Sequence, residues 1–284
     1  MTISTSSNIH EPYGNQSHYF SLKESIEACK KAGFTHIDLT LHDFAKRDQP
    51  LGKDNWKRFV EETGKALEEN RITANQSHTI FYLHQDTEEN LAFNAMMVER
   101  CIEASHMLSI PVTVMHILRV KDIGTDDKKV GMEKNVEYFK PYGDMARKYG
   151  VRIAIENGLT GFYHSADELM ELIGRLNDDA FGLCWDTGHA NITGQDQERA
   201  IRLMGEKLLT VHINDNSAQK DQHLLPFFGT VEWKPVMQAI RDIQFKNVLT
   251  FESPGSTKRL PPDLRQDMLR LAVKIGSKLH ELEA

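Results

Sequence analysis

Six ionisable side chains recur at the ends of short apolar runs, at intervals of about one strand and one helix. They are His78, His116, Glu156, Asp186, His212 and Glu252, separated by 38, 40, 30, 26 and 40 residues. Imidazoles and carboxylates together are suitable ligands for a divalent cation such as Mn²⁺, Zn²⁺, Co²⁺ or Mg²⁺. A cation would also offset the repulsion between three clustered carboxylates, which otherwise raises their pKa values.

Each residue taken alone also has an ordinary structural interpretation. A single histidine at a strand end is often a capping or loop group. A carboxylate inside an apolar strand is harder to explain in this way, because burying an unpaired carboxylate is costly. Glu156 follows the run IAI and Glu252 follows LTF. The recurrence of such residues over six successive runs favours a site over coincidence.

The elements that must position these residues alternate along the chain. Apolar and β-branched runs predict eight strands, at residues 2–6, 35–41, 72–78, 111–117, 151–157, 180–186, 208–215 and 247–253. Helical periodicity follows each run, at residues 21–33, 55–70, 88–108, 132–150, 165–177, 197–208, 232–243 and 261–282. Ser21 with Glu24 forms a predicted capping box, as does Ser165 with Glu168. Gly33 and Gly150 stand where helix ends are expected.

This alternation predicts the fold class and the place of the site. Strands that alternate with helices pair in parallel through right-handed crossovers. Eight such units in 284 residues predict a single (β/α)₈ TIM barrel, with residues 1–284 as one domain. The carboxyl ends of its strands share one face, so the six side chains should converge there. A doubly wound open sheet is the alternative, but no G-x-G-x-x-G follows the first strand.

Composition limits the partners that can be expected. The chain has 34 basic and 41 acidic residues, a net charge of −7, so a broad basic surface for nucleic acid is absent. No apolar run approaches the roughly 18–20 residues of a membrane helix. The stretch MTISTSSNIH has no signal-peptide features. We therefore expect a cytoplasmic protein without a membrane partner, and a homo-oligomer is left open. Cys29, Cys101 and Cys184 are expected to be buried thiols.

Other side chains near the predicted site give weaker signals. Trp185 alternates with Asp186 along its strand, so it should point into the helix layer. Asp38 and His42, on and after the second strand, could contact substrate or be structural. Aromatic residues in the predicted loops could wall a pocket or pack between loops: Phe81, Tyr82, Phe162, Tyr163, Phe227 and Phe228.

At the residues of the predicted site, the chain resembles the xylose isomerase-like TIM barrels. The resemblance is carried by IAIEN, CWDTGHAN, VHINDN, DQHLLPFFGTVEW and FES. That group includes sugar and sugar-phosphate isomerases and epimerases, and the endonuclease IV type of apurinic endonucleases. The epimerase pattern implies that Glu156, Asp186, His212 and Glu252 are metal ligands, and that Glu156 and Glu252 are the catalytic acid/base pair. It also implies that His189 contacts substrate oxygens.

The resemblance does not fix the substrate. Epimerases of free ketoses usually carry an arginine in the loop after the seventh strand, where this chain has Lys220, Asp221 and His223. The endonuclease pattern implies a trinuclear zinc site with nine ligands. Matching positions are occupied by His78, His116, Glu156, Asp186, His189, His212, Asp221, His223 and Glu252. The segments WDTGHAN and HLLPFFGTVEW are more similar in sequence to the sugar-isomerase branch.

The sequence therefore predicts a divalent-metal-dependent isomerase or epimerase of a small sugar or sugar phosphate, with a mononuclear site. The remaining polar residues are expected to bind substrate or additional metal: His78, His116, His189, Asp221 and His223. Three alternatives stay open. They are a zinc-dependent phosphodiesterase acting on abasic DNA, a lyase or dehydratase of a cyclic polyol, and a barrel that binds metal or sugar without turnover.

Overall fold

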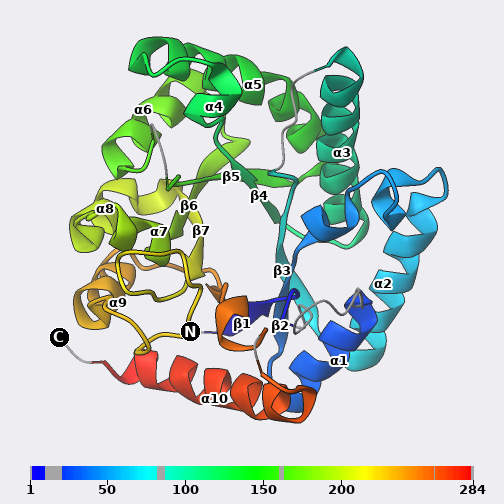
Figure 1. Cartoon of the computed structure of the whole chain (residues 1–284), viewed down its shortest axis with the longest axis vertical. Coiled ribbons are helices and arrows are strands. Elements are labelled where there is room, and N and C mark those ends of the chain that lie inside the picture. The colour runs from blue at the N-terminus through cyan, green and yellow to red at the C-terminus, as the bar shows by residue number, and fades with distance from the viewer. Residues whose placement is uncertain (1, 10–20, 82–86, 160–162, 259, 283–284) are drawn as a thin grey trace.

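Eight parallel strands close into a barrel in which each strand pairs with its neighbours in sequence and β1 pairs with β8. The structure is a computed structural model that describes residues 2–9, 21–81, 87–159, 163–258 and 260–282. The strands are β1 (Ile3–Ser6), β2 (His36–Leu39), β3 (Thr73–His78), β4 (Val112–His116), β5 (Arg152–Glu156), β6 (Phe181–Asp186), β7 (Leu208–Ile213) and β8 (Leu249–Phe251). Closure confirms the predicted (β/α)₈ barrel and excludes the open sheet (Figure 1).

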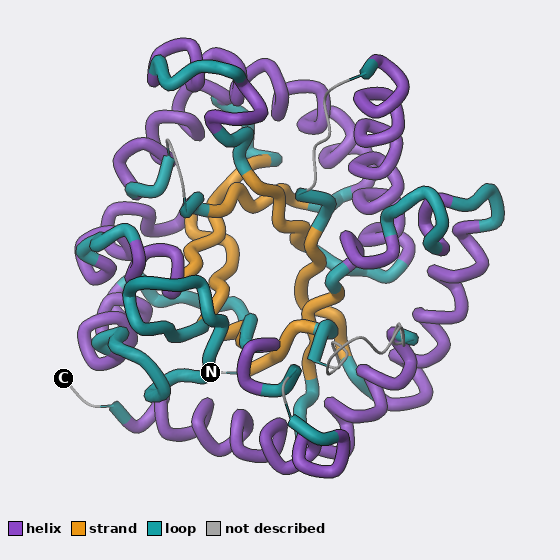
Figure 2. Tube along the Cα trace, viewed as in Figure 1, coloured by secondary structure: helices purple, strands orange, loops and turns teal. Residues whose placement is uncertain are grey.

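The helices form an outer layer around the strands, as Figure 2 shows. The α-helices are α1 (Leu22–Ala32), α2 (Trp56–Asn70), α3 (Glu88–Met107), α4 (Val120–Ile123), α5 (Lys128–Tyr149), α6 (Ala166–Leu176), α7 (Thr187–Ile192), α8 (Gln197–Met204), α9 (Trp233–Asp242) and α10 (Pro262–Glu281). Short 3₁₀ helices are η1 (Leu41–Phe44), η2 (Pro50–Gly52), η3 (Gly205–Lys207) and η4 (Pro254–Ser256).

Local sequence signals fix several helix ends as predicted. Ser21 and Ser165 each accept a hydrogen bond from the backbone N–H three residues later, and the glutamate there bonds back, which completes both capping boxes. Gly33, at φ 105°, and Gly150, at φ 66°, end α1 and α5 in the left-handed region that glycine adopts without strain.

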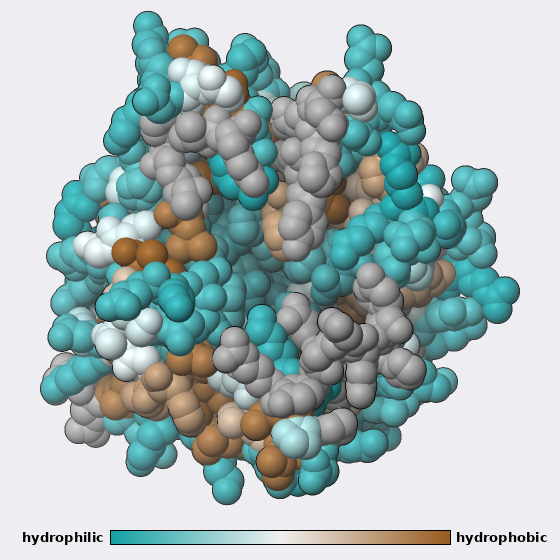
Figure 3. Space-filling model, in the orientation of Figure 1, coloured by the Kyte–Doolittle hydropathy of each residue, from teal (hydrophilic) through white to brown (hydrophobic). Residues whose placement is uncertain are grey.

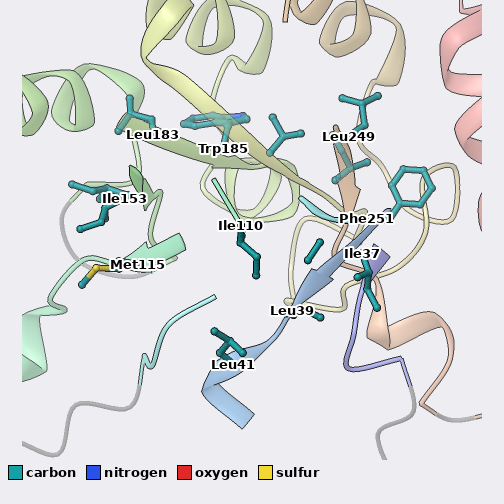
Figure 4. Close-up of a cluster of buried hydrophobic side chains, with 14 of the residues drawn as sticks. Ile37, Leu39, Leu41, Ile110, Met115, Ile153, Leu183, Trp185, Leu249 and Phe251 are labelled. Atoms are coloured by element: carbon teal, nitrogen blue, oxygen red, sulfur yellow. The ribbon is translucent and has the colours of Figure 1, made fainter. Parts of the chain in front are cut away.

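The main core lies between the barrel and its helices. Outward-facing strand residues such as Ile37, Leu183 and Phe251 are completely buried there (Figure 4). Trp185 belongs to this layer, as predicted, and its indole N–H donates to the Oε1 atom of Gln197 in α8 over 3.4 Å. A smaller apolar cluster is formed by Val112, Val114, Ala154, Cys184 and Leu209.

Two local features differ from the sequence-based expectation. Between the strand predicted at 180–186 and the helix predicted at 197–208, where no element was predicted, lies the short helix α7. The reason is that the Asp186 carboxylate accepts from the backbone N–H of His189 and acts as its N-cap. The helix expected at residues 132–150 begins earlier, at Lys128, because Asp127 caps the backbone N–H groups of Lys129 and Val130.

The three cysteines are buried, as expected from the sequence. Cys29, Cys101 and Cys184 are all buried free thiols. Within the described part of the chain, no helix combines the length and the apolar character that crossing a bilayer requires.

Candidate metal centre

The predicted ionisable residues converge at the carboxyl ends of the strands. His78, His116, Glu156 and Asp186 end four consecutive strands, β3 to β6. His212 lies one residue before the end of β7, and Glu252 directly follows β8. A cavity of about 420 Å³ opens above them. Figure 3 shows the hollow at the centre of this face, lined by hydrophilic residues.

One candidate site among the described residues has four donor atoms, one each from Glu156, Asp186, His212 and Glu252, and all lie within 4.8 Å of one another. The Nδ1 atom of His212 is their centre. It lies 2.9 Å from Glu156 Oε1, 3.3 Å from Glu252 Oε2 and 4.0 Å from Asp186 Oδ2. Three carboxylates around one imidazole nitrogen are a donor set that suits a divalent cation.

Two further donor groups adjoin this site. On one side, the Nε2 atoms of His78 and His116 lie 3.3 and 2.9 Å from Glu156 Oε2. On the other side, Asp221 Oδ2 lies 3.0 Å from His223 Nε2 and 3.7 Å from His189 Nε2. The side chains of each group bring three donor atoms within 4.8 Å of one another. All nine residues of the endonuclease-like pattern are therefore brought together.

Backbone carbonyls fix the proton position on three of the imidazoles. The Nδ1–H groups of His78, His189 and His223 donate to the carbonyl oxygens of Thr79, Asn157 and Glu252, over 2.8, 2.9 and 3.1 Å. A carbonyl only accepts, so Nδ1 carries the proton when these rings are neutral. Their Nε2 lone pairs then face the carboxylates, and this is the arrangement found in histidines that bind metal.

Asp186 is held by two amide side chains that directly follow β5 and β7. Its Oδ2 atom accepts 2.6 Å from Asn214 Nδ2, and its backbone N–H donates to Asn157 Oδ1 over 2.7 Å. Gly188 leaves room for this contact, since a Cβ atom there would lie 1.8 Å from Asn214 Oδ1. The short helix α7 and the ends of β5 and β7 thus fix the direction of the Asp186 carboxylate.

The surroundings shift the pKa values of the carboxylates in opposite directions. Burial raises the pKa of Asp186 to about 6, and the charges of Glu156 and Glu252 act in the same direction. Burial alone would also raise the pKa of Glu156, but His116 and His212 outweigh it and hold that pKa well below its usual range. The pKa of Glu252 is likewise lowered, because His212 and His223 outweigh its burial.

Most of the histidines that face these carboxylates have raised pKa values and gain protons more readily, whereas burial lowers the pKa of His116. Burial opposes protonation, but Asp186, Asp221 and Glu156 raise the pKa of His189 well above its usual range. Cys184, Glu252 and Glu156 do the same for His212. Glu252 and Asp221 raise the pKa of His223 to about 9 against the same opposing effect of burial. The metal-free site therefore neutralises its carboxylates with protons on imidazoles.

The weaker sequence signals have mixed outcomes. His42 and Phe81 line the cavity, whereas Asp38 does not and lies buried in β2, where burial raises its pKa to about 7. Tyr163 is buried, and Phe227 and Phe228 are largely exposed. Tyr82 and Phe162 lie outside the described residues.

Sequence reasoning missed the amide side chains that support the site. Asn157 and Asn214 bind the Asp186 segment, and Gln76 lies 2.9 Å from His212 Nε2. The signal that could have found Gln76 is its position two residues before His78 in a strand, which places both on the same face. Asn157 directly follows Glu156, within a run whose polar residues had already been singled out.

The long loop after β7 is organised by one buried carboxylate. Asp215 accepts from the backbone N–H groups of Phe227 and Val231 and from the indole N–H of Trp233, over 3.1, 3.0 and 3.0 Å. Leu224 pairs with Asp215 through the backbone, which fixes the loop directly after His223. Within DQH, Asp221 and His223 line the cavity.

Comparison with known proteins identifies the family. Residues 26–273 match the family model described as "Xylose isomerase-like TIM barrel". The chain belongs to this family. The resemblance read from the five sequence stretches is therefore confirmed for the xylose isomerase-like barrel as a whole.

Individual relatives are distant in sequence. "Uncharacterized protein y4fM" from Sinorhizobium fredii (strain NBRC 101917 / NGR234) is 25% identical, over 82% of this chain and 81% of its own length. Inosose isomerase from Bacillus subtilis (strain 168) is 22% identical, over 91% of this chain and 94% of its own. The crystal structure of D-psicose 3-epimerase in the presence of D-fructose has a TM-score of 0.77 at 17% identity, over 99% of both chains. At this identity the structural likeness shows the fold alone.

The protonated histidines predict how the stability of the metal-free protein depends on pH. A group whose pKa is raised on folding stabilises the fold below its unfolded pKa, and this stability is lost as pH rises through the folded pKa. For His223 this interval runs from 6.5 to about 9. Urea unfolding in the presence of a chelator should therefore give a free energy of unfolding that falls between pH 6.5 and 9.

A divalent cation should reverse this trend, because its ligands must lose their protons before they bind it. The variant His223→Gln serves as the control, and it should show a shallower fall in the metal-free form. A free energy of unfolding that stays constant or rises over the same interval, without metal, contradicts the proposed charge distribution.

Proposed function

We propose that this protein is a divalent-metal-dependent isomerase or epimerase of a small sugar or sugar phosphate. The observation that carries the proposal is the four-donor group at the base of the cavity, in which two glutamates flank the Nδ1 atom of His212. The inosose isomerase relative and the D-psicose 3-epimerase likeness support the class of substrate.

The donor set fits a resident divalent cation. Glu156, Asp186, His212 and Glu252 together offer three carboxylates and one imidazole, which leaves room for further oxygen ligands and suits Mn²⁺, Co²⁺, Zn²⁺ or Mg²⁺. When bound, such a cation supplies positive charge beside the reacting carbon atoms, and this charge stabilises an enediolate.

The two glutamates move the proton. Glu156 is ionised at neutral pH because its histidine neighbours lower its pKa, so it can accept a proton from the carbon beside a carbonyl. Glu252 is ionised as well, so it first takes up a proton from solvent and then delivers it to the opposite face or to the neighbouring carbon, and Glu156 releases its proton to solvent after turnover. The side chain of Glu252 is 13% exposed, against 1% for Glu156, so Glu252 is the carboxylate that exchanges its proton with solvent.

The cavity suits a small polar substrate. Its volume of about 420 Å³ falls within the range of small-molecule sites. Phe81, Ile117 and Leu159 line it with apolar surface, whereas Asn8 and Lys258 add polar groups. Apolar and polar lining groups together can contact both the carbon skeleton and the hydroxyl or phosphate groups of a sugar.

A second candidate function rests on the two additional donor groups. The rings of His78, His189 and His223 have their Nε2 lone pairs directed at carboxylates, as ligands of further ions would. A site with three zinc ions is typical of the apurinic endonuclease branch, which cleaves phosphodiester bonds. The net charge of −7 favours the sugar substrate over DNA.

The catalytic pair predicts the effect of removing one proton acceptor at a time. Glu156→Gln and Glu252→Gln should each lower solvent-deuterium incorporation into a substrate by at least about 10²-fold, because a general base is lost. The assay follows deuterium in D-fructose, D-psicose or an inosose by mass spectrometry, with bound metal measured in each variant.

Glu61→Gln, on the exposed face of α2, is the matched control and should exchange deuterium at the parent rate. Near-parent exchange in either active-site variant, on a substrate that the parent turns over, would overturn the two-carboxylate mechanism.

Asp186 and His189 should respond differently to truncation. In a mononuclear site Asp186 binds the metal directly, so Asp186→Ala should purify largely metal-free. His189 contacts substrate instead, so His189→Ala should keep its metal and lose turnover by about 10–100-fold. Elemental analysis of both purified variants makes the comparison. Equal metal loss in both, from a parent that holds more than one ion, would support the multinuclear zinc enzyme instead.

A further inference from the structure

A glutamine amide lies inside the barrel, directly below the candidate metal centre. Gln76 in β3 is completely buried. Its amide nitrogen lies 2.9 Å from Nε2 of His212, across the barrel in β7. Its amide oxygen accepts from the hydroxyl groups of Thr210 and Thr250, the latter over 3.1 Å. An amide inside a protein is costly unless it is fully hydrogen-bonded, so its partners account for its position.

The two ring nitrogens of His212 face different surroundings. Nδ1 faces the carboxylates of Glu156 and Glu252, and Nε2 faces Gln76. To bind a cation, Nδ1 must present a lone pair, and the proton of the neutral ring must then lie on Nε2. The group that faces Nε2 must therefore accept a hydrogen bond.

The Gln76 amide can supply that acceptor without moving its neighbours. A half-turn of the amide exchanges its oxygen and nitrogen in nearly the same space. The oxygen then faces the Nε2–H of His212, and the NH₂ group faces the hydroxyl oxygens of Thr210 and Thr250. Thr250 already accepts from Ser4 and Asn75, so it accepts from Gln76 once its own hydroxyl hydrogen turns to Ser4 and reverses that hydrogen bond. Every polar atom of the amide is satisfied in this orientation.

We propose that Gln76 is a positioning residue, whose amide oxygen accepts the Nε2–H of His212 and thereby holds the Nδ1 lone pair toward the metal. The inference rests on the metal site proposed above. His78, His189 and His223 have their protons fixed by backbone carbonyls instead. For His212 a side chain, not a carbonyl, fixes the position of the proton. A single substitution can therefore remove the hydrogen-bond acceptor.

The strand register is irregular directly before Gln76 and directly before its partner Thr210. Between β2 and β3 the register shifts, with Ile37 opposite Ala74 but Asp38 opposite Gln76, so Asn75 is an extra residue. A similar shift in β7 comes directly before Thr210. Such bulges redirect side chains near functional sites. Both ends of the hydrogen-bonded chain therefore follow a bulge.

The test compares metal affinity in two variants at this position. Gln76→Leu keeps the approximate size of the side chain but removes the acceptor, and it should weaken Mn²⁺ or Zn²⁺ binding by about 10–100-fold. Gln76→Glu restores an acceptor, so it should bind within a few-fold of the parent or more tightly. Competition with a chelator gives the dissociation constants, and thermal unfolding of the metal-free forms reports on the fold.

Asn75→Leu is the matched control. Asn75 is the neighbour in the same bulge and donates to Thr250 over 3.0 Å, but no hydrogen bond joins it to His212. It should keep the parent affinity even if the fold loses stability. A purely structural role of Gln76 predicts the opposite pattern, in which metal affinity follows the loss of stability in all three variants and Gln76→Glu gives no rescue.

A second readout needs no variant. In ¹⁵N-histidine spectra of the Zn²⁺-loaded parent, one metal-bound imidazole should carry its proton on Nε2, unlike His78, His189 and His223. Parent-like affinity in Gln76→Leu overturns the role of Gln76 while the metal site stands. Absence of that signal shows that His212 does not bind the ion through Nδ1, and it overturns both the role of Gln76 and this ligand of the proposed site. A parent protein that binds neither ion overturns the metal site as well, and Asp186→Ala with parent affinity places the ion elsewhere and overturns both.

Discussion

Three carboxylates share the mouth of this barrel, and their mutual repulsion is the constraint on which the rest of the site depends. Glu156 is the most tightly surrounded of them, with His78 and His116 at one oxygen and His212 and His189 at the other. Such a buried charge cluster is stable only with compensating positive charge. Without metal, protonated imidazoles provide it, and in the proposed enzyme a divalent cation takes over that role.

The surrounding structure keeps this cluster in one geometry. The parallel barrel brings six strand ends to one face, and the main chain fixes several imidazoles through its carbonyl groups. Amide side chains do the remaining work: Asn214 holds the Asp186 carboxylate, and Gln76 faces His212. Asp215 organises the long loop that brings Asp221 toward His189. Support of this kind matters because a metal ligand binds well only in a fixed orientation.

Strand ends and helix caps could be predicted from the sequence because their signals are local. Apolar and β-branched runs located the strands, and the capping boxes at Ser21 and Ser165 located two helices. The supporting amides could not be predicted, since the partners of Gln76 lie more than 130 residues away along the chain. The bulge at Asn75 changes strand register without changing the apolar pattern, and α7 is fixed by a cap that a loop-like composition conceals.

The central claim is that Glu156, Asp186, His212 and Glu252 hold a divalent cation used for proton transfer in a sugar. Anomalous X-ray diffraction at the absorption edge of Mn or Zn, from crystals of the metal-loaded protein, tests it most directly. We expect one ion per chain, bonded to His212 Nδ1 and the three carboxylates. No anomalous peak at that position would contradict the metal site, and three ions shared among all nine side chains would contradict the mononuclear isomerase.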